Sequence, residues 1–194
     1  MTQPVPALPP TEANPLTRLV YRIARRRFGE VPEPFAVAAR HTGLLWTNLV
    51  HELALERATG AAPSALVQLA VYRTAWTVGC SWCVDFGAML QRLDGLDTVR
   101  LREIDDFETS PAYTELERQV IRLSDAMTAT PPAEATELLT PLRDRLGDRG
   151  ALELVYQIAH ENQRARMNHA LGITGQGFSD GSACRVPWDA SPQA

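Results

Sequence analysis

ALVQLAVYRTAWTVGCSWCVDFGAMLQRLDG, residues 65–95, contains hydrophobic residues at helical spacing and two cysteines separated by two residues. The run Thr77-Val78-Gly79 interrupts this pattern, because β-branched residues have restricted side chains and glycine inside a helix costs about 1 kcal/mol relative to alanine. We therefore predict two helices with a break at Gly79, and we place Cys80 in the first turn of the second helix.

Outside this stretch, apolar residues also recur every three or four positions, which is the spacing of a helix with one buried face. In the first of these segments the predicted buried stripe consists of Leu16, Leu19, Val20, Ile23 and Ala24. No segment shows the strict alternation of a half-buried strand, so the predicted fold class is all-α. Further helices are expected at about 15–28, 35–58, 97–106, 110–128, 133–146 and 148–171.

Length and composition favour one domain with a core of its own, since the chain has 194 residues, of which 45% are apolar and 22% charged. We predict a mobile, proline-rich N-terminal arm at 1–13, a single all-α domain at 14–173 and an irregular C-terminal tail at 174–194. The net charge of −4 argues against nucleic acid as a partner, because a phosphate backbone binds to basic surfaces. No apolar run reaches the roughly 20 residues that span a bilayer, and the N-terminus lacks the layout of a signal peptide. We therefore expect no membrane association and a cytoplasmic location.

Cys80 and Cys83 form a C-x-x-C motif, which in the cytoplasm is more typical of redox or metal chemistry than of a permanent disulfide. If the motif is helical, the two Cα atoms lie about 5 Å apart, inside the roughly 4.4–6.8 Å range of disulfides. The unpaired N–H groups and the dipole at a helix N-terminus also favour a thiolate. Asp85 points roughly 200° around the helix from Cys83, which favours a structural role for this carboxylate.

Two alternatives to redox activity remain open for the pair. Half of a zinc site needs two further ligands, and His160 and His169 are nine residues apart, which does not repeat the paired spacing. The two cysteines are alternatively small core residues without chemistry, because free cysteine is among the most buried residue types. We favour redox activity, and we expect no metal and no cofactor.

Three stretches resemble the core of the carboxymuconolactone decarboxylase superfamily, which includes alkyl hydroperoxidase D. They are YRTAWTVGCSWCVDFGAMLQRLDG, ERQVIRLSDAMT and LRDRLGDRGALELVYQIAHENQRARMNHALGI, and the resemblance covers roughly residues 35–173. It implies an alkyl hydroperoxidase D-like helical array, usually a trimer or hexamer, and an antioxidant thiol enzyme. In such enzymes one cysteine attacks a peroxide and the other resolves it as a disulfide. By this analogy Cys83 attacks and Cys80 resolves.

The chain departs from the peroxidase pattern of this family, which has a glutamate twelve residues before the first cysteine and a histidine four residues after the second. Those positions hold Gln68 and Gly87, so the motif is a divergent C-x-x-C-x-D-x-G. Neither residue transfers a proton as glutamate or histidine does. Glu161 and His160, in the segment HENQRARMNH, are candidates for a replacement proton relay. A helical ion pair for Glu161 and a core or surface position for His160 are the alternatives.

The leading hypothesis is a thiol-dependent oxidoreductase, similar to peroxiredoxins and alkyl hydroperoxidases, that cycles Cys80 and Cys83 between dithiol and disulfide. Its expected partners are a hydroperoxide or another small molecule, a disulfide-exchange reductant protein, and further copies of the chain in a homo-oligomer. Cys184 in the tail is a candidate third thiol for exchange with the pair. A decarboxylase or lactone-processing enzyme of the same superfamily and a non-catalytic oligomeric helical module are the alternatives.

Overall fold

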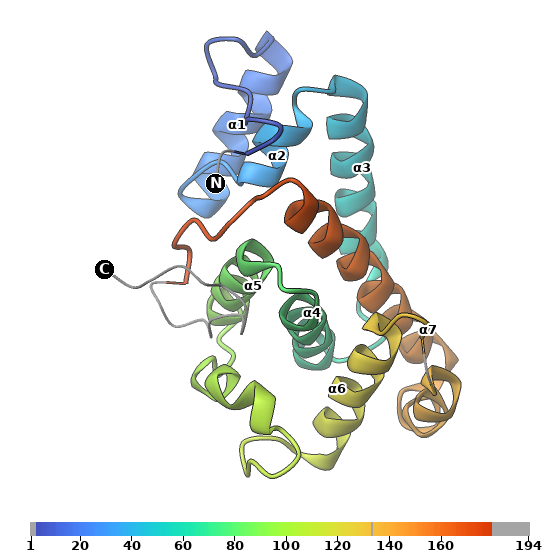
Figure 1. Cartoon of the computed structure of the whole chain (residues 1–194). Coiled ribbons are helices and arrows are strands. Elements are labelled where there is room, and N and C mark those ends of the chain that lie inside the picture. Colours follow the sequence, from blue (N-terminus) through green and yellow to red (C-terminus); the bar gives the residue numbers. More distant parts are fainter. Residues whose placement is uncertain (1–2, 133, 180–194) are drawn as a thin grey trace. The chain divides into compact units, whose positions relative to one another are not determined.

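All regular secondary structure in the described residues is helical. The structure, a computed structural model, describes residues 3–132 and 134–179 (Figure 1). The predicted all-α fold class is confirmed. The helices are α1 (Pro15–Phe28), α2 (Glu33–Ala38), α3 (Thr42–Ala58), α4 (Ser64–Val78), α5 (Ser81–Leu93), the 3₁₀ helix η1 (Val99–Asp106), α6 (Glu115–Thr128) and α7 (Ala135–Ala170).

The described residues divide into two compact units. Unit 1 contains the described residues within Met1–Thr59 and Leu171–Ile173. Unit 2 contains the described residues within Gly60–Ala170 and Thr174–Ala194. The cysteine pair and the predicted relay residues all belong to unit 2. The predicted arm, single domain and tail, with boundaries at residues 13 and 173, stay a prediction.

In unit 1, α1 begins where the side chain of Asn14 caps the helix by accepting a hydrogen bond from the Thr17 N–H at 2.8 Å. The hydroxyl of Tyr21 donates to the Leu8 carbonyl at 2.9 Å, and the Leu8 N–H donates to the Ala36 carbonyl at 2.8 Å. These bonds join the segment before α1 to both α1 and α2. The core of unit 1 therefore includes part of the predicted N-terminal arm.

Two details of unit 1 differ from the sequence prediction. The expected helix at 35–58 is two helices, since the chain turns after Ala38 and the His41 side chain caps α3 by accepting from the Leu44 N–H at 3.2 Å. Of the predicted buried stripe of α1 only Ala24 is buried, and the other buried residues of this helix are Thr17 and Tyr21. The reason is that Tyr21 bonds to the segment before α1, which turns its own face of the helix inward. The exposed apolar residues of α1 are Leu16, Leu19 and Ile23.

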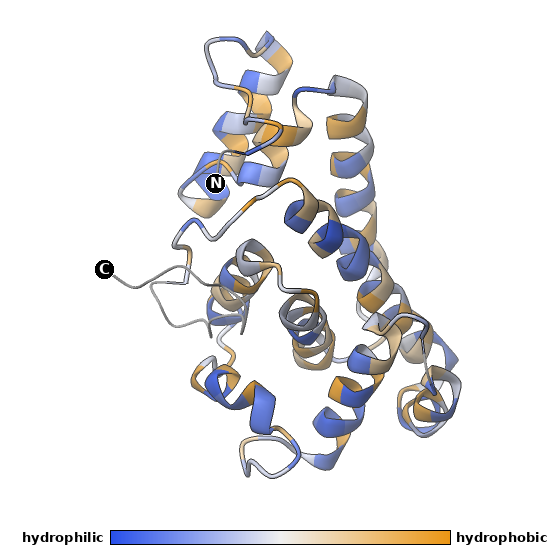
Figure 2. Cartoon of the chain, in the orientation of Figure 1, coloured by the Kyte–Doolittle hydropathy of each residue, from blue (hydrophilic) through white to orange (hydrophobic). Residues whose placement is uncertain are grey.

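Unit 2 is built around α4, which contacts α5, α6 and α7. Arg73 of α4 forms a two-pronged ion pair with Asp125 of α6, at 2.6 and 2.9 Å, and Thr77 donates to the same carboxylate at 2.9 Å. In Figure 2 hydrophobic and hydrophilic bands alternate along α6, as expected for a helix that packs on one side. The buried hydrophobic core shared by α4, α6 and α7 consists of Leu66, Ala70, Val120, Leu123, Leu142, Leu154 and Ile158.

Both predicted helix breaks in unit 2 are present. Gly79 has φ 87° and ψ 29°, a left-handed conformation that ends α4. Gly147 has φ 71° and ψ 171° and interrupts α7. The helix expected at 110–128 begins later, at Glu115, because Thr114 forms a capping box with Glu117. Glycine tolerates positive φ without the steric cost that other residues carry, so Gly79 fixes where α5 starts.

The same substitution at two glycines near the cysteine pair is expected to have opposite effects. Gly79→Ala forces a side chain into the left-handed region and lowers the free energy of unfolding by about 1–2 kcal/mol. Gly87→Ala lies inside α5, where the new Cβ would be 3.8 Å from Tyr72, an ordinary contact distance. It raises the free energy of unfolding by about 0.5–1 kcal/mol. Urea denaturation measures both changes, and equal effects at the two positions would contradict the assignment of Gly79 as the helix-ending residue.

Candidate functional site

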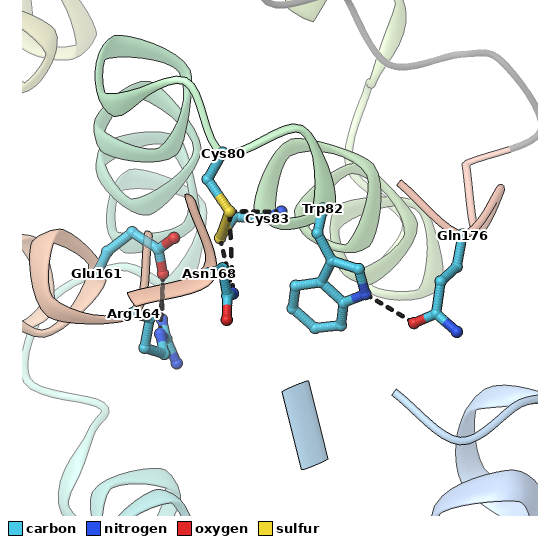
Figure 3. Close-up of a disulfide and its surroundings, with 7 residues drawn as sticks. All are labelled: Cys80, Trp82, Cys83, Glu161, Arg164, Asn168 and Gln176. Carbon is cyan, nitrogen blue, oxygen red and sulfur yellow. Dashed lines mark hydrogen bonds and ion pairs between the residues drawn. A yellow bond between two sulfur atoms is a disulfide. The ribbon is translucent and has the colours of Figure 1, made fainter. Parts of the chain in front are cut away.

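Cys80 and Cys83 form a disulfide at the start of α5 (Figure 3). Their Cα atoms lie 5.2 Å apart, close to the distance expected for one helical turn. Cys80 is the N-cap residue of α5, with extended φ/ψ of −84° and 92°, so it precedes the first turn in which we had placed it. The bond forms without disturbing the helix, because Cys83 is already in the first turn.

Three N–H groups point at the two sulfur atoms. The backbone N–H of Cys83 donates to Sγ of Cys80 at 3.2 Å. The side-chain amide of Asn168, from α7, donates to Sγ of Cys83 at 3.4 Å and to Sγ of Cys80 at 3.8 Å. Cys80 is 1% exposed and Cys83 is 8% exposed. The pair is therefore buried but surrounded by hydrogen-bond donors, which favour the charged form of sulfur and oppose the effect of burial.

An aromatic cluster borders the disulfide. The ring of Trp82 stacks on Phe86 at a centroid distance of 4.7 Å, and Phe178 meets both rings edge-on. Nε1 of Trp82 donates to Oε1 of Gln176 at 2.7 Å, as Figure 3 shows. Residues 176–178, which follow α7, thus lie against the face of α5 that carries Trp82 and Phe86.

Asp85 fixes this same segment to α5 through its carboxylate. Its Oδ2 accepts hydrogen bonds from the N–H groups of Gln176, Gly177 and Phe178 at 3.0, 2.8 and 3.0 Å, and its Oδ1 accepts from Ser179 at 2.8 Å. Four backbone donors around one buried carboxylate account for the aspartate in the motif. Asp85 therefore has the structural role that its direction on the helix indicated.

The candidate relay residues lie on α7. Glu161 is 3% exposed and its Oε2 accepts from Nη2 and Nε of Arg164 at 2.6 and 2.9 Å. Figure 3 shows Glu161, Arg164 and Asn168 along α7 beside the disulfide. His160 is also buried, at 7% exposure, but lies about 100° around the helix from Glu161. The structure thus places Glu161 on the side of α7 nearest the pair and pairs it with a cation.

The structure shows which side chains lie next to Gln68 and Gly87, the two positions that depart from the peroxidase pattern. The side-chain amide of Gln68 donates to Oδ2 of Asp94, at the C-terminal end of α5. Gly87 faces the ring of Tyr72, which is 1% exposed. Cys184, the candidate third thiol, lies outside the described residues.

The described part of the chain lacks the arrangements that are typical of metal centres and of membrane-spanning helices. No group of three or more histidine, cysteine, aspartate or glutamate side chains is arranged there to hold a metal ion. No helix there is both long enough and apolar enough to cross a membrane.

Comparison with known proteins places this geometry in a structural class. No family model matches the chain. It resembles the debrominase Bmp8, solved in complex with 2,3,4-tribromopyrrole, with a TM-score of 0.79 and 18% identity over 94% of this chain and 96% of that one. It also resembles the alkylhydroperoxidase AhpD core of a peroxidase-related protein from Ralstonia eutropha, with a TM-score of 0.76 and 15% identity over 95% of this chain and 100% of that one. The chain has the alkyl hydroperoxidase D-like helical fold, and the predicted resemblance is confirmed.

The chain also matches relatives by sequence. The uncharacterized protein YnjA of Escherichia coli is 29% identical over 183 residues, which are 93% of this chain and 97% of that protein. The alkyl hydroperoxide reductase Rv2159c of Mycobacterium tuberculosis is 34% identical over 79 residues, which are 39% of this chain and only 22% of that protein.

Asn168 is the residue that the sequence analysis missed. It is 85 residues from Cys83 in sequence, so its contact with the sulfur atoms is a tertiary one that local patterns do not report. A signal was nonetheless present, because Asn168 follows Glu161 by seven positions and Arg164 by four, which places all three on one helix face.

Removing the carboxylate of Asp85 is expected to release the segment that follows α7. In Asp85→Ala the amides of residues 176–179 lose an ionised acceptor, and their hydrogen exchange accelerates roughly 10- to 100-fold. Asp94→Ala is the matched control, since this carboxylate is on the same stretch of chain and bonds to Gln68 instead. Exchange mass spectrometry measures the rates, and equal exchange in the two variants would refute the anchoring role.

Proposed function

We propose that the protein is a thiol-dependent oxidoreductase in which Cys80 and Cys83 cycle between dithiol and disulfide. The observation that carries the proposal is the disulfide across the first turn of α5, with three N–H donors directed at its sulfur atoms. Such surroundings stabilise a thiolate, which is the form that attacks peroxides and disulfides. The alkyl hydroperoxidase D-like fold supports the same chemistry by analogy.

The cycle with a hydroperoxide balances as follows. The Cys83 thiolate attacks the terminal oxygen of R–O–OH, the O–O bond breaks, and the products are a sulfenic acid and an alkoxide that takes up a proton to become R–OH. The Cys80 thiol then attacks this sulfur, which forms the disulfide and releases water. A reductant dithiol returns both thiols and becomes a disulfide itself.

The different surroundings of the two sulfurs support Cys83 as the attacking thiol. Cys83 is the more exposed of the pair, at 8% against 1% for Cys80. Cys80 accepts a hydrogen bond from the first turn of α5, which stabilises it as a thiolate leaving group when a reductant attacks Cys83. The order implied by the family resemblance and the order favoured by exposure therefore agree.

The proton relay of this enzyme would use α7 in place of the family's glutamate and histidine. Glu161 is buried, is paired with Arg164, and lies on the same face of α7 as Asn168, which contacts the sulfur atoms. His160 stays the second candidate.

A second candidate reaction is the reductive removal of halogen from an aromatic ring. It is favoured by the cluster of Trp82, Phe86 and Phe178 beside the disulfide, which suits an aromatic substrate, and by the fold likeness to a debrominase. In the balanced reaction an aryl bromide and the dithiol give the aryl C–H compound, the disulfide and HBr. Bromide release from 2,3,4-tribromopyrrole in the absence of any reaction with hydroperoxides would favour this function.

The proposal predicts a specific mass change on oxidation. The reduced protein treated with one equivalent of cumene hydroperoxide loses two hydrogen atoms as the disulfide forms. Cys83→Ser shows no loss, whereas Cys80→Ser gains one oxygen as a sulfenic acid that dimedone traps. All variants carry Cys184→Ser as well, so that only Cys80 and Cys83 can form a disulfide. Intact-mass spectrometry distinguishes these outcomes. A wild-type protein that stays reduced, or a Cys83→Ser variant that loses the same mass, would exclude the proposed cycle.

We also propose that the protein forms a homo-oligomer and is located in the cytoplasm. The exposed residues Leu16, Leu19 and Ile23 form an apolar stripe on α1 that suits contact with a further copy of the chain. Light scattering is expected to give a multiple of the 21.4 kDa chain mass, and a single-chain mass would contradict the oligomer.

A further inference from the structure

We propose that the side-chain amide of Asn168 stabilises the Cys83 thiolate and thereby sets the reactivity of the pair at neutral pH. This inference rests on the proposed function, because it assigns the group that activates the attacking thiol. It gives that role to a neutral donor on α7 in a chain that has glycine where the family pattern places a histidine.

The geometry of Asn168 suits this role. Its Nδ2 lies 3.4 Å from Sγ of Cys83 and 3.8 Å from Sγ of Cys80, and the residue is 5% exposed. An amide nitrogen carries two hydrogens, so one side chain can donate to both sulfurs. Figure 3 shows the amide directed at the pair from the α7 side. A donor that is itself buried is not weakened by competition with water.

The donors divide between the two cysteines. The first-turn N–H of α5 serves Cys80, at 3.2 Å, while the shorter of the two contacts of Asn168 goes to Cys83. Burial of a thiol disfavours its charged form. A hydrogen bond donated to the thiolate acts in the opposite direction. Asn168 therefore offsets the burial that the site needs in order to exclude water.

An amide also differs from a histidine in its dependence on pH. It neither gains nor loses a proton across the physiological range, so it donates equally well in acid and in base. Alkylation of Cys83 needs no proton relay, so its rate should follow the titration of the thiol itself in a single step. A single step in the dependence of the rate on pH therefore distinguishes this inference from a mechanism in which His160 activates the thiol.

The test measures the alkylation rate of Cys83 by iodoacetamide against pH, in a Cys80→Ser background, with the modified peptide identified by mass. Asn168→Leu removes the donor, and the rate at pH 7 is expected to fall about tenfold or more as the pKa of the thiol rises. Asn168→Asp keeps the shape of the side chain but brings a negative charge, so the alkylation rate falls further.

Asn162→Leu is the matched control, because this amide on the same helix donates to Thr128 and Ile158 and not to sulfur. Its rate should stay within about twofold of the background.

A measurement on the chain without a substitution in α7 keeps the inference testable if the variants fold poorly. In the reduced wild-type protein, the side-chain amide signal of Asn168 in a nitrogen-15 NMR spectrum should shift with the same midpoint pH as the alkylation of Cys83. Unchanged alkylation in both Asn168 variants, or an amide signal that ignores the titration, would overturn the inference. A wild-type protein that passes these tests yet forms no disulfide with peroxide would instead count against the proposed function.

Discussion

The left-handed turn at Gly79 is the constraint on which the site depends. It ends α4 and lets the chain reverse into α5 within two residues, so that Cys80 caps the new helix and Cys83 falls one turn later. Two consequences follow from this single backbone feature. The sulfur atoms come within bonding distance across one helical turn, and both lie at the N-terminal end of α5, where backbone N–H groups lack partners within the helix. Position in the fold thus supplies both the partner and the polarity that a redox pair needs.

The remaining parts of the site come from the far end of the chain. α7 brings Glu161, Arg164 and Asn168 to one side of the pair, and the segment after it closes over the aromatic face of α5. Asp85 holds that segment through four backbone N–H groups. The motif C-x-x-C-x-D-x-G therefore combines a chemical element, the two cysteines, with a structural one, the aspartate. The departures from the peroxidase pattern at Gln68 and Gly87 are the reason why we propose that groups of α7 act in their place.

The sequence predicted the features that depend on local chemistry. Gly79 follows two β-branched residues and Gly147 separates two apolar helical patterns, and the predicted breaks at both glycines occur. Predictions from local sequence were wrong where tertiary contacts determine the helix bounds or the buried face. The turn after Ala38 contains neither glycine nor proline, and it was missed because His41 caps α3 with its side chain. The buried face of α1 follows from the bond of Tyr21 to Leu8 rather than from the apolar stripe. The contact of Asn168 with sulfur joins residues far apart in sequence, and no spacing rule reports it.

If the proposed function is right, the cysteine pair opens and closes reversibly while the helical scaffold stays intact. Equilibration of the protein in a series of dithiol–disulfide buffers tests this, with intact mass and circular dichroism measured on the same samples. We expect one reversible two-electron transition, assigned to Cys80 and Cys83, with an unchanged helical spectrum on both sides. A pair that cannot be reduced without loss of helix, or that does not reoxidise, would contradict it.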